Sequence, residues 1–300
     1  MKRAKFIGVG VVSVTAAAAF SILLIVLLIV VDIVVGGHER LTWEFLTQAP
    51  TEGMTEGGIF PAIVGTALLV LIMSIAGVPI GTITAIYLSE YASEGSYLAR
   101  IIRFAVGTLA GVPAIVFGLF GLGFFVQFVG GGIDKVLTGG ATLRWGQPNI
   151  LWASLTMSLL TLPVVIVSVE EALKAVPREI REASYALGAT RWQTIRKILI
   201  PSSMTGILTG GILAVSRGAG EVAPILFTGA AYFLPYLPSS LSDQFMELGY
   251  HIYIMTTQSV DVEATRPIQY ATTLVLLLLT FLLNFSAIFL RYRVRTRQNR

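Results

Sequence analysis

The sequence predicts an all-α polytopic membrane protein with six transmembrane helices. Of its 300 residues, 55% are hydrophobic and 13% are charged, whereas about 25% of the residues in a soluble domain carry charge. The mean hydropathy is +0.79, and the apolar residues gather in six long runs. Because a soluble fold cannot hide this much apolar surface from water, the chain is expected in a lipid bilayer.

Each of the six runs is long enough to cross a bilayer, which takes about 20 helical residues. The first is an uncharged run of 26 residues at 6–31, which exceeds the apolar core of about 7–15 residues in a cleaved secretory signal. We therefore expect it to be kept as a first transmembrane helix. The other predicted spans lie at 59–88, 101–129, 150–169, 204–230 and 268–290.

The distribution of lysine and arginine predicts the orientation of these spans. Sixteen of the 21 basic residues lie in the N-terminus, the 89–103 loop, the 170–201 segment and the C-terminus, and four lie in the opposite loops. Cytoplasmic loops carry such an excess. Both termini and the 170–201 segment are therefore expected in the cytoplasm, on one side of an inner or plasma membrane.

The composition also excludes several kinds of site. The chain contains no cysteine, so disulfides and thiolate metal sites are excluded, and no metal site is predicted. The basic tail at 291–300 follows a span directly, where arginines meet anionic headgroups. Tyr292 is the one aromatic residue in that tail, so a stacking surface for nucleic acid is not expected.

One long polar segment, 170–201, interrupts the apolar runs. It is rich in residues that favour helices, Pro177 suits a helix start, and Gly188 indicates a turn between two short helices. Trp192, Ile195, Ile198 and Leu199 recur at helical spacing and predict one apolar face. The segment is therefore either a plain connecting loop or a helix–turn–helix outside the lipid that serves a partner.

The spacing within this segment resembles the EAA loop of ABC importer permeases. That loop carries Glu-Ala-Ala, a glycine and Ile-x-Leu-Pro at fixed intervals, and Ser184 and Ile200 are small departures from it. The resemblance implies a coupling helix that docks into a groove on a separate ATPase. The implied coupling residues are Glu182, Ala183, Ser184, Gly188, Ile198 and Pro201.

Small residues recur every four positions in three of the predicted spans, which predicts close helix packing in lipid. The three ladders are Gly77/Gly81/Ala85, Gly107/Gly111 and Gly206/Gly210/Ala214/Gly218.

A pair of opposite charges, Arg217 and Glu221, lies inside the fifth predicted span. Charged residues in hydrocarbon usually face a bundle interior or water, and at this spacing on a helix the two can pair. The pair is either a neutralised structural feature or part of a substrate path. An arginine on such a path suits an oxyanion, because its planar fork matches phosphate or carboxylate oxygens.

Several segments from residue 57 onwards resemble phosphate ABC transporter permeases of the PstA type. They include GGIFPAIVGTALLV, GVPAIVFGLFGLGFF, SRGAGEVAPILFTG and FMELGYHIY. The resemblance implies the type I ABC importer permease fold, with the family's Arg and Glu of the fifth span at Arg217 and Glu221. It also implies a heterodimer with a homologous PstC-type permease, an ATPase homodimer on the cytoplasmic face, and a phosphate-binding protein outside.

The chain has no GxxxxGK[ST] phosphate loop, so we expect no enzyme activity and no cofactor here, with ATP and Mg on the partner ATPase. The expected domains are 1–58, a first transmembrane helix with an outer loop, 59–290, the ABC transporter transmembrane domain, and 291–300, a basic tail. Two other functions stay open: a permease for molybdate, tungstate or sulfate, and an ion-coupled secondary transporter. Secondary transporters usually consist of two halves with related sequences, and no inverted repeat is visible in this sequence.

Overall fold

The structure is a computed structural model that describes residues 2–51, 54, 56–93, 95–259 and 261–298. Almost all of its regular elements are helices. In chain order they are α1 (Lys2–Gly37), η1 (His38–Arg40), α2 (Trp43–Thr47), β1 (Pro50–Thr51), β2 (Glu56–Gly57), α3 (Phe60–Ile86), η3 (Tyr87–Tyr91), α4 (Tyr97–Ala110), α5 (Ala114–Gly121), η4 (Leu122–Gly130), α6 (Gly131–Thr138), α7 (Ile150–Lys174), α8 (Arg178–Ala186), α9 (Arg191–Thr194), η5 (Ile195–Leu199), α10 (Ile200–Gly218), α11 (Leu248–Thr257) and α12 (Val262–Gln298). The short strands β1 and β2 pair antiparallel.

Six helical stretches of the described residues are long and apolar enough to cross a membrane, as the sequence predicts. They are Gly10–Arg40, Phe60–Tyr91, Ala114–Thr138, Ile150–Lys174, Arg191–Gly218 and Val262–Val294. Helix α7 is the central one, because 67% of its most apolar stretch is buried, against 33% or less in the other five. Helices α3 and α10 pack along it.

Glycines bring these three helices close together, as two of the three predicted ladders require. A Cβ on Gly206 would lie 2.1 Å from the Cβ of Ala172, and one on Gly81 would lie 2.7 Å from Val165. The ladder at Gly107 and Gly111 does not pack in this way, because no other helix of the described chain comes within 4 Å of a Cβ at either position. That prediction of close packing is wrong within this chain.

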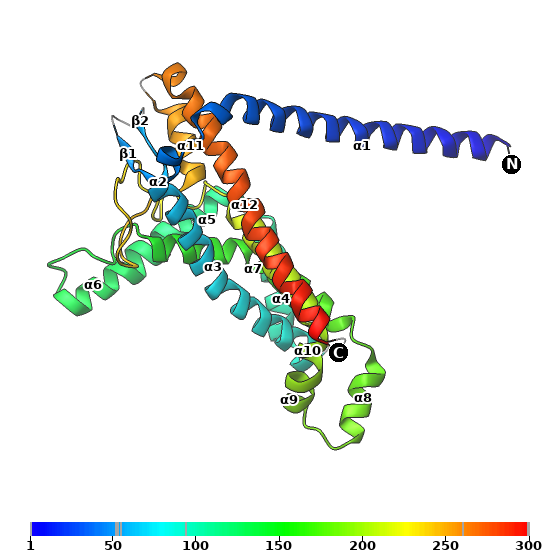
Figure 1. Cartoon of the computed structure of the whole chain (residues 1–300). Helices are drawn as coiled ribbons and strands as arrows, with labels where there is room; N and C mark the ends of the chain where they lie inside the picture. Colours follow the sequence, from blue (N-terminus) through cyan, green and yellow to red (C-terminus); the bar gives the residue numbers. More distant parts are fainter. Residues whose placement is uncertain (1, 52–53, 55, 94, 260, 299–300) are drawn as a thin grey trace.

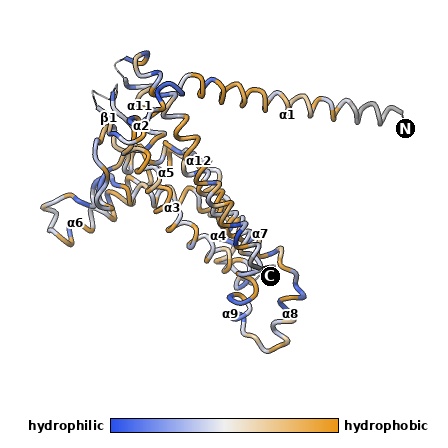
Figure 2. Tube along the Cα trace, in the orientation of Figure 1, coloured by the Kyte–Doolittle hydropathy of each residue, from blue (hydrophilic) through white to orange (hydrophobic). Residues whose placement is uncertain are grey.

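The bundle has two distinct ends (Figure 1). Helices α2, α6 and α11 and the small sheet lie at one end, and α8, α9 and the C-terminus lie at the other. Helix α1 contacts α12 near Gly36 and Gly37, which pack on Tyr270 and Ala271, and then runs away from the body. Figure 2 shows apolar residues along α1, α3 and α12 and polar ones at both ends.

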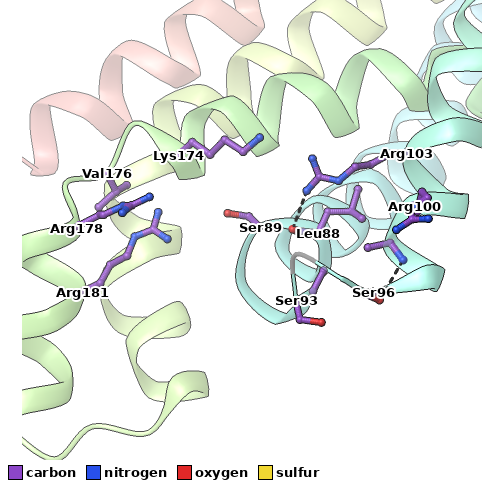
Figure 3. Close-up of a pocket in the computed structure, with 12 residues that line it drawn as sticks. Leu88, Ser89, Ser93, Ser96, Arg100, Arg103, Lys174, Val176, Arg178 and Arg181 are labelled. Carbon is purple, nitrogen blue, oxygen red and sulfur yellow. Dashed lines mark hydrogen bonds between the residues drawn. The ribbon is translucent and has the colours of Figure 1, made fainter.

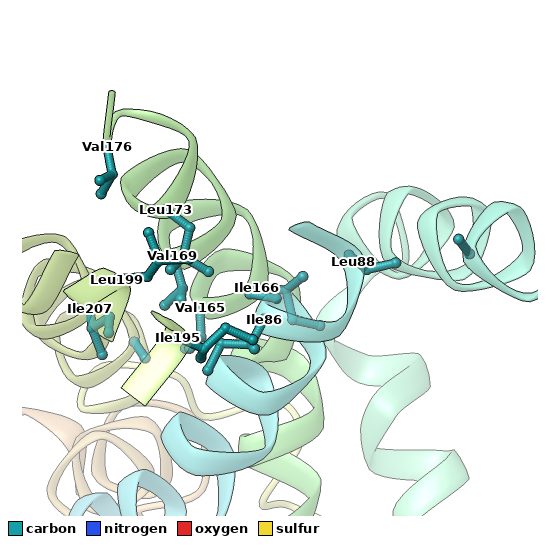
Figure 4. Packing of buried hydrophobic residues seen from close by; sticks show 13 residues of the cluster. Ile86, Leu88, Val165, Ile166, Val169, Leu173, Val176, Ile195, Leu199 and Ile207 are labelled. Atoms are coloured by element: carbon teal, nitrogen blue, oxygen red, sulfur yellow. The ribbon is translucent and has the colours of Figure 1, made fainter. Parts of the chain in front are cut away.

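A buried apolar cluster fills the end of the bundle near α8 and α9 (Figure 4). Val165, Val169 and Leu173 of α7 meet Ile195 and Leu199 of η5 there. All five side chains are fully buried. The polar 170–201 segment is therefore rooted in the core through its own apolar residues.

The third predicted span, 101–129, is wrong in its bounds. The helix stops at Ala110, and a second one starts at Ala114. Pro113 has no N–H and disfavours a helical residue before it, which explains the break. Only the part from Ala114 to Thr138 qualifies as a span, so α4 is a separate half-length helix.

The fifth predicted span, 204–230, is also wrong at its end, because α10 stops at Gly218. The next residues form turns, and Glu221 lies outside the helix. Gly218, Gly220 and Pro224 are poor helix residues, and their combined effect ends the regular structure. A further element, α11, falls in a stretch that the sequence assigns to an outer loop, and yet Leu248, Ile254 and Met255 of it are buried.

Candidate functional site

The segment that follows α7 forms a helical hairpin at the tip of the bundle (Figure 1). Helix α8 ends at Ala186, and the chain reverses at Gly188, whose φ of +81° is left-handed. Glycine adopts this conformation without a steric penalty. Thr190 and Gln193 form a capping box that starts α9. The predicted helix–turn–helix with its glycine turn is therefore confirmed.

The two arms of this hairpin are joined by a buried contact between side chains. The hydroxyl oxygens of Ser184 in α8 and Thr194 in α9 lie 2.9 Å apart, and the two residues are 5% and 0% exposed. Buried polar groups of this kind need their partner, because losing it costs desolvation energy. Ser184, which replaces the family's second alanine, thus fixes the spacing of the arms.

The tip of the hairpin presents apolar side chains to the outside. Leu187, next to the turn, is 90% exposed, and Tyr185, Ile180 and Trp192 are exposed as well. Trp192 therefore departs from the predicted apolar face, while Ile195 and Leu199 are buried.

Ion pairs tie the hairpin to the second span and tie α7 to α4. Arg181 of α8 reaches Glu90 of η3, with Nη1 and Oε1 2.8 Å apart. At the end of α7, Glu170 pairs with Arg103 at 3.0 Å and with Lys174 at 2.8 Å. The hairpin is therefore linked to the second span, and α4 is linked to α7, at the same end of the bundle.

Five of the six predicted coupling residues lie in the hairpin or in η5, which follows it, and Pro201 lies in α10. Ser184, Gly188 and Ile198 line one hollow of about 330 Å³ between the arms. Glu182 and Ala183 lie on an exposed stretch of α8, and Pro201 lies in the first turn of α10. The structure thus brings three of the six together around the turn and places the others beside it.

The second predicted site, Arg217 and Glu221, lies where α10 ends. Arg217 Nε and Glu221 Oε1 are 3.8 Å apart, and the side chains are 41% and 29% exposed. This separation is an ion pair but too long for a hydrogen bond. Among the described residues no acceptor takes a hydrogen bond from the guanidinium of Arg217, so its N–H groups remain available to an anion.

The end of α10 is packed closely on one side. A Cβ on Gly218 would lie 2.5 Å from Met73 of α3, whereas one on Gly220 would meet no atom within 4 Å. Gly218 therefore seats the helix end on α3, and Gly220 leaves open space beside the charged pair.

The sequence analysis did not identify a buried acid, Glu247, at the other end of the bundle. Glu247 caps α11 through the amides of Gly249 and Tyr250, at 2.9 and 2.6 Å, and is 2% exposed. Burial raises the pKa of this carboxyl to about 7. The sequence does carry a signal for this cap, because an acidic residue directly before a short apolar run is typical of a helix N-cap. No cluster of three or more possible metal ligands occurs among the residues that the structure describes.

Comparison with known proteins supports a transport role. Residues 77–300 match the family described as "Binding-protein-dependent transport system inner membrane component". The chain is 31% identical over 246 residues to the probable ABC transporter permease protein YqgI of Bacillus subtilis, covering 77% of this chain and 78% of that protein. It is 32% identical over 227 residues to the phosphate transport system permease protein PstA of Xylella fastidiosa, covering 76% and 74%. A PstA of Yersinia pestis is 36% identical, but the match covers 67% of this chain and 59% of that protein.

Solved structures show the same fold at low identity. A bacterial alginate ABC transporter gives a TM-score of 0.62 at 16% identity, covering 88% of this chain and 87% of that one. The MetNI methionine ABC transporter gives 0.53 at 18%, covering 79% and 94%. The shared fold is that of a type I ABC importer permease.

Members of this family are transporter subunits and not enzymes, and ABC importers work with ATPases and substrate-binding proteins as partners. The span count, the hairpin at the tip and the family match agree with one another. The chain therefore belongs to the inner membrane components of binding-protein-dependent transport systems, as an ABC importer permease of the PstA type.

Proposed function

We propose that this chain is the permease subunit of an ATP-driven phosphate importer. It forms the translocation path with a second, PstC-type permease, and a phosphate-binding protein delivers substrate from outside. An ATPase homodimer that carries ATP and Mg binds the cytoplasmic hairpin. Both termini lie in the cytoplasm in this arrangement, on the side with most basic residues.

The observation that carries the proposal is the open guanidinium of Arg217. Its side chain is 41% exposed within the chain, and its N–H groups have no hydrogen-bond acceptor among the described residues. Phosphate accepts such N–H groups in a bidentate manner. Glu221 at 3.8 Å weakens the net attraction, and this suits a path that must also release its anion.

The hairpin supplies the means of coupling. Leu187 at the tip is 90% exposed, and such apolar side chains favour burial against a partner protein. The buried link from Ser184 to Thr194 and the ion pair from Arg181 to Glu90 make the hairpin stiff. Movement of the ATPase would therefore be passed to α3, α7 and α10 instead of being absorbed by a loop.

Helix α1 favours a second permease as the partner. Its most apolar stretch has no buried residues, and within the part of the chain that the structure describes it contacts other elements at its C-terminal end. Lipid or the second permease can cover this helix, and the proposed heterodimer supplies both. The domains follow as 1–58, 59–290 and 291–300, although α12 continues without interruption into the basic tail.

Uptake of radiolabelled phosphate by the assembled complex in vesicles tests the proposal. We expect ATP-dependent uptake of labelled phosphate. Unlabelled phosphate should inhibit this uptake by competition, whereas molybdate, tungstate and sulfate should not. Stronger competition by molybdate would assign the permease to another oxyanion. Uptake that survives loss of the ATPase but collapses with the proton gradient would assign it to secondary transport.

A further inference from the structure

Two side-chain hydrogen bonds join α10 and α12 within the membrane-spanning part of the chain. The hydroxyl of Ser216 donates to Oδ1 of Asn284 at 2.5 Å, and Nη1 of Arg291 donates to the hydroxyl of Thr209 at 3.1 Å. The two contacts are seven residues apart along each helix and run in antiparallel order. Because seven residues make about two turns of an α-helix, both contacts lie on one seam between the helices.

Asn284 is a polar residue within an apolar run of α12. Leu283 precedes it, Phe285 follows it, and the run belongs to a stretch that is apolar enough to cross a membrane. A polar side chain in such a helix usually faces a neighbouring helix or a cavity and takes a polar partner there. Ser216 of α10 is the partner that Asn284 has in this structure.

This contact falls on the last turn of α10, directly before Arg217. Ser216 faces α12, whereas Gly218 faces α3, where a Cβ on the glycine would lie 2.5 Å from Met73. Successive residues of an α-helix point about 100° apart, so Arg217 lies between these two contacts. The turn that carries Arg217 is therefore held from two sides.

The side chain of Arg217 does little to fix its own position. Within the described part of the chain its polar contact is the ion pair with Glu221, whose atoms are 3.8 Å apart. By contrast, Arg103, which lines a cavity beside the hairpin, donates to the carbonyl of Leu88 at 3.2 Å (Figure 3) and pairs with Glu170 at 3.0 Å. The place of the Arg217 guanidinium therefore depends on the backbone turn that carries it.

We propose that Asn284 is a positioning residue for anion transport: through Ser216 it holds the last turn of α10 against α12, so that Arg217 presents its N–H groups at a fixed depth. This role rests on the proposed function, because that function assigns Arg217 to the anion path. A slip of α10 along α12 by one turn would break the contacts at Ser216 and Thr209 together. Lipid offers neither group a replacement, so the seam sets the register of the two helices.

Phosphate uptake by the assembled complex in vesicles, measured over a range of phosphate concentrations, tests this role. Ser216→Ala and Asn284→Leu each remove one side of the hydrogen bond. We expect each to raise the phosphate concentration at half-maximal uptake by about threefold to tenfold, with little change in the maximal rate. The double variant should be no worse than the more impaired single variant, since both lose the same contact. Ser216→Thr keeps the hydroxyl and should restore wild-type behaviour.

Thr209→Val is the matched control, because it removes a hydroxyl from the same seam two turns away from Arg217. It should lower the unfolding temperature of the complex about as much as Ser216→Ala does but leave the half-maximal concentration unchanged. Asn284→Leu leaves Ser216 with the carbonyl of Ile212 at 2.9 Å, so this variant should assemble. An unchanged half-maximal concentration in Ser216→Ala and Asn284→Leu, or a defect in Asn284→Leu that Ser216→Ala does not share, would overturn the proposal.

A second measurement does not depend on phosphate. The chain contains no cysteine, so Arg217→Cys gives it a single thiol, and any cysteines of the partner subunits are replaced. The rate at which a water-soluble thiol reagent modifies this thiol in the assembled complex reports the position of residue 217. Adding Ser216→Ala should raise that rate by about threefold or more, and adding Thr209→Val should not.

The two measurements separate the positioning role from the phosphate importer. An unchanged modification rate with Ser216→Ala would overturn the positioning role even if the complex transports phosphate. A raised rate in a complex whose wild type takes up no phosphate would support the positioning role and count against the importer alone.

Discussion

The guanidinium of Arg181 lies 2.8 Å from the carboxylate of Glu90, 91 residues earlier in the chain. The side chains are 19% and 5% exposed. This contact joins the first helix of the hairpin to the end of the second span. Because both groups are largely buried, each depends on the other to compensate for the loss of water.

Removing one partner should uncouple the hairpin from the span. We expect Arg181→Gln to lower the free energy of unfolding by roughly 3 kcal/mol, because Glu90 is left buried and unpaired. ATP hydrolysis by the assembled complex should continue while phosphate uptake per ATP falls, as measured in vesicles. The control is Arg266→Gln, which breaks the exposed pair with Glu263 and should change neither rate. Normal coupling in Arg181→Gln would show that the contact transmits nothing.

The turn of the hairpin allows docking to be separated from folding. A Cβ at Gly188 would meet no atom within 4 Å, but φ there is +81°. Asparagine tolerates the left-handed region, so Gly188→Asn should assemble normally. Gly188→Trp places a bulky ring at the tip and should prevent ATPase binding. Co-purification of the ATPase with each variant measures this, and retention with the tryptophan would contradict docking at the turn.

Arg217 is expected to act on the anion and not on the fold. Replacing a charged hydrogen-bond donor costs about 1.5–3 kcal/mol, so Arg217→Gln should lower phosphate uptake by about tenfold to a hundredfold. The complex should still assemble, because the side chain is 41% exposed and its ion pair is 3.8 Å long. Glu221→Gln offers the opposite change: it frees the arginine, so phosphate should bind more tightly and leave more slowly. Normal uptake by Arg217→Gln would make the pair structural.

The hairpin could be predicted closely from the sequence because its signals are local. Pro177, Gly188 and the capping pair of Thr190 and Gln193 act within a few residues of themselves. The number of membrane spans could be predicted equally well, because the length and hydropathy of the apolar runs determine it. Both features were confirmed by the structure.

What the sequence could not show depends on packing and on helix breaks inside apolar runs. Pro113 splits the third run although the sequence is apolar on both sides of it, and Gly218 ends α10 before Glu221. The buried helix α11 was missed because its burial comes from packing against α12, which follows it in the chain, and against α3, which lies far earlier in the sequence.

Glu247 predicts a dependence of stability on pH. Burial raises its pKa from 4.5 to about 7, so the folded protein holds a proton that the unfolded chain releases above pH 4.5. The free energy of unfolding therefore decreases as the pH rises from 4.5 to about 7, by roughly 3 kcal/mol at most. Thermal unfolding of the detergent-solubilised complex should show this fall. Glu247→Gln, which stays neutral, should flatten it, whereas Glu263→Gln, at an exposed site, should leave the slope unchanged.

The two kinds of glycine in the predicted ladders give a matched test of close helix packing. An alanine at position 206 would place its Cβ 2.1 Å from that of Ala172, so α10 and α7 must separate, and overpacking of this kind costs about 1–3 kcal/mol. An alanine at position 107 meets nothing within 4 Å and should change stability by no more than about 0.5 kcal/mol. Unfolding temperatures of Gly206→Ala and Gly107→Ala in the same detergent measure the difference. Gly107→Ala could be the more destabilising of the two in the assembled complex but not in the isolated chain. That result would show that α4 packs on the second permease through Gly107, and that the ladder of Gly107 and Gly111 has its partner there.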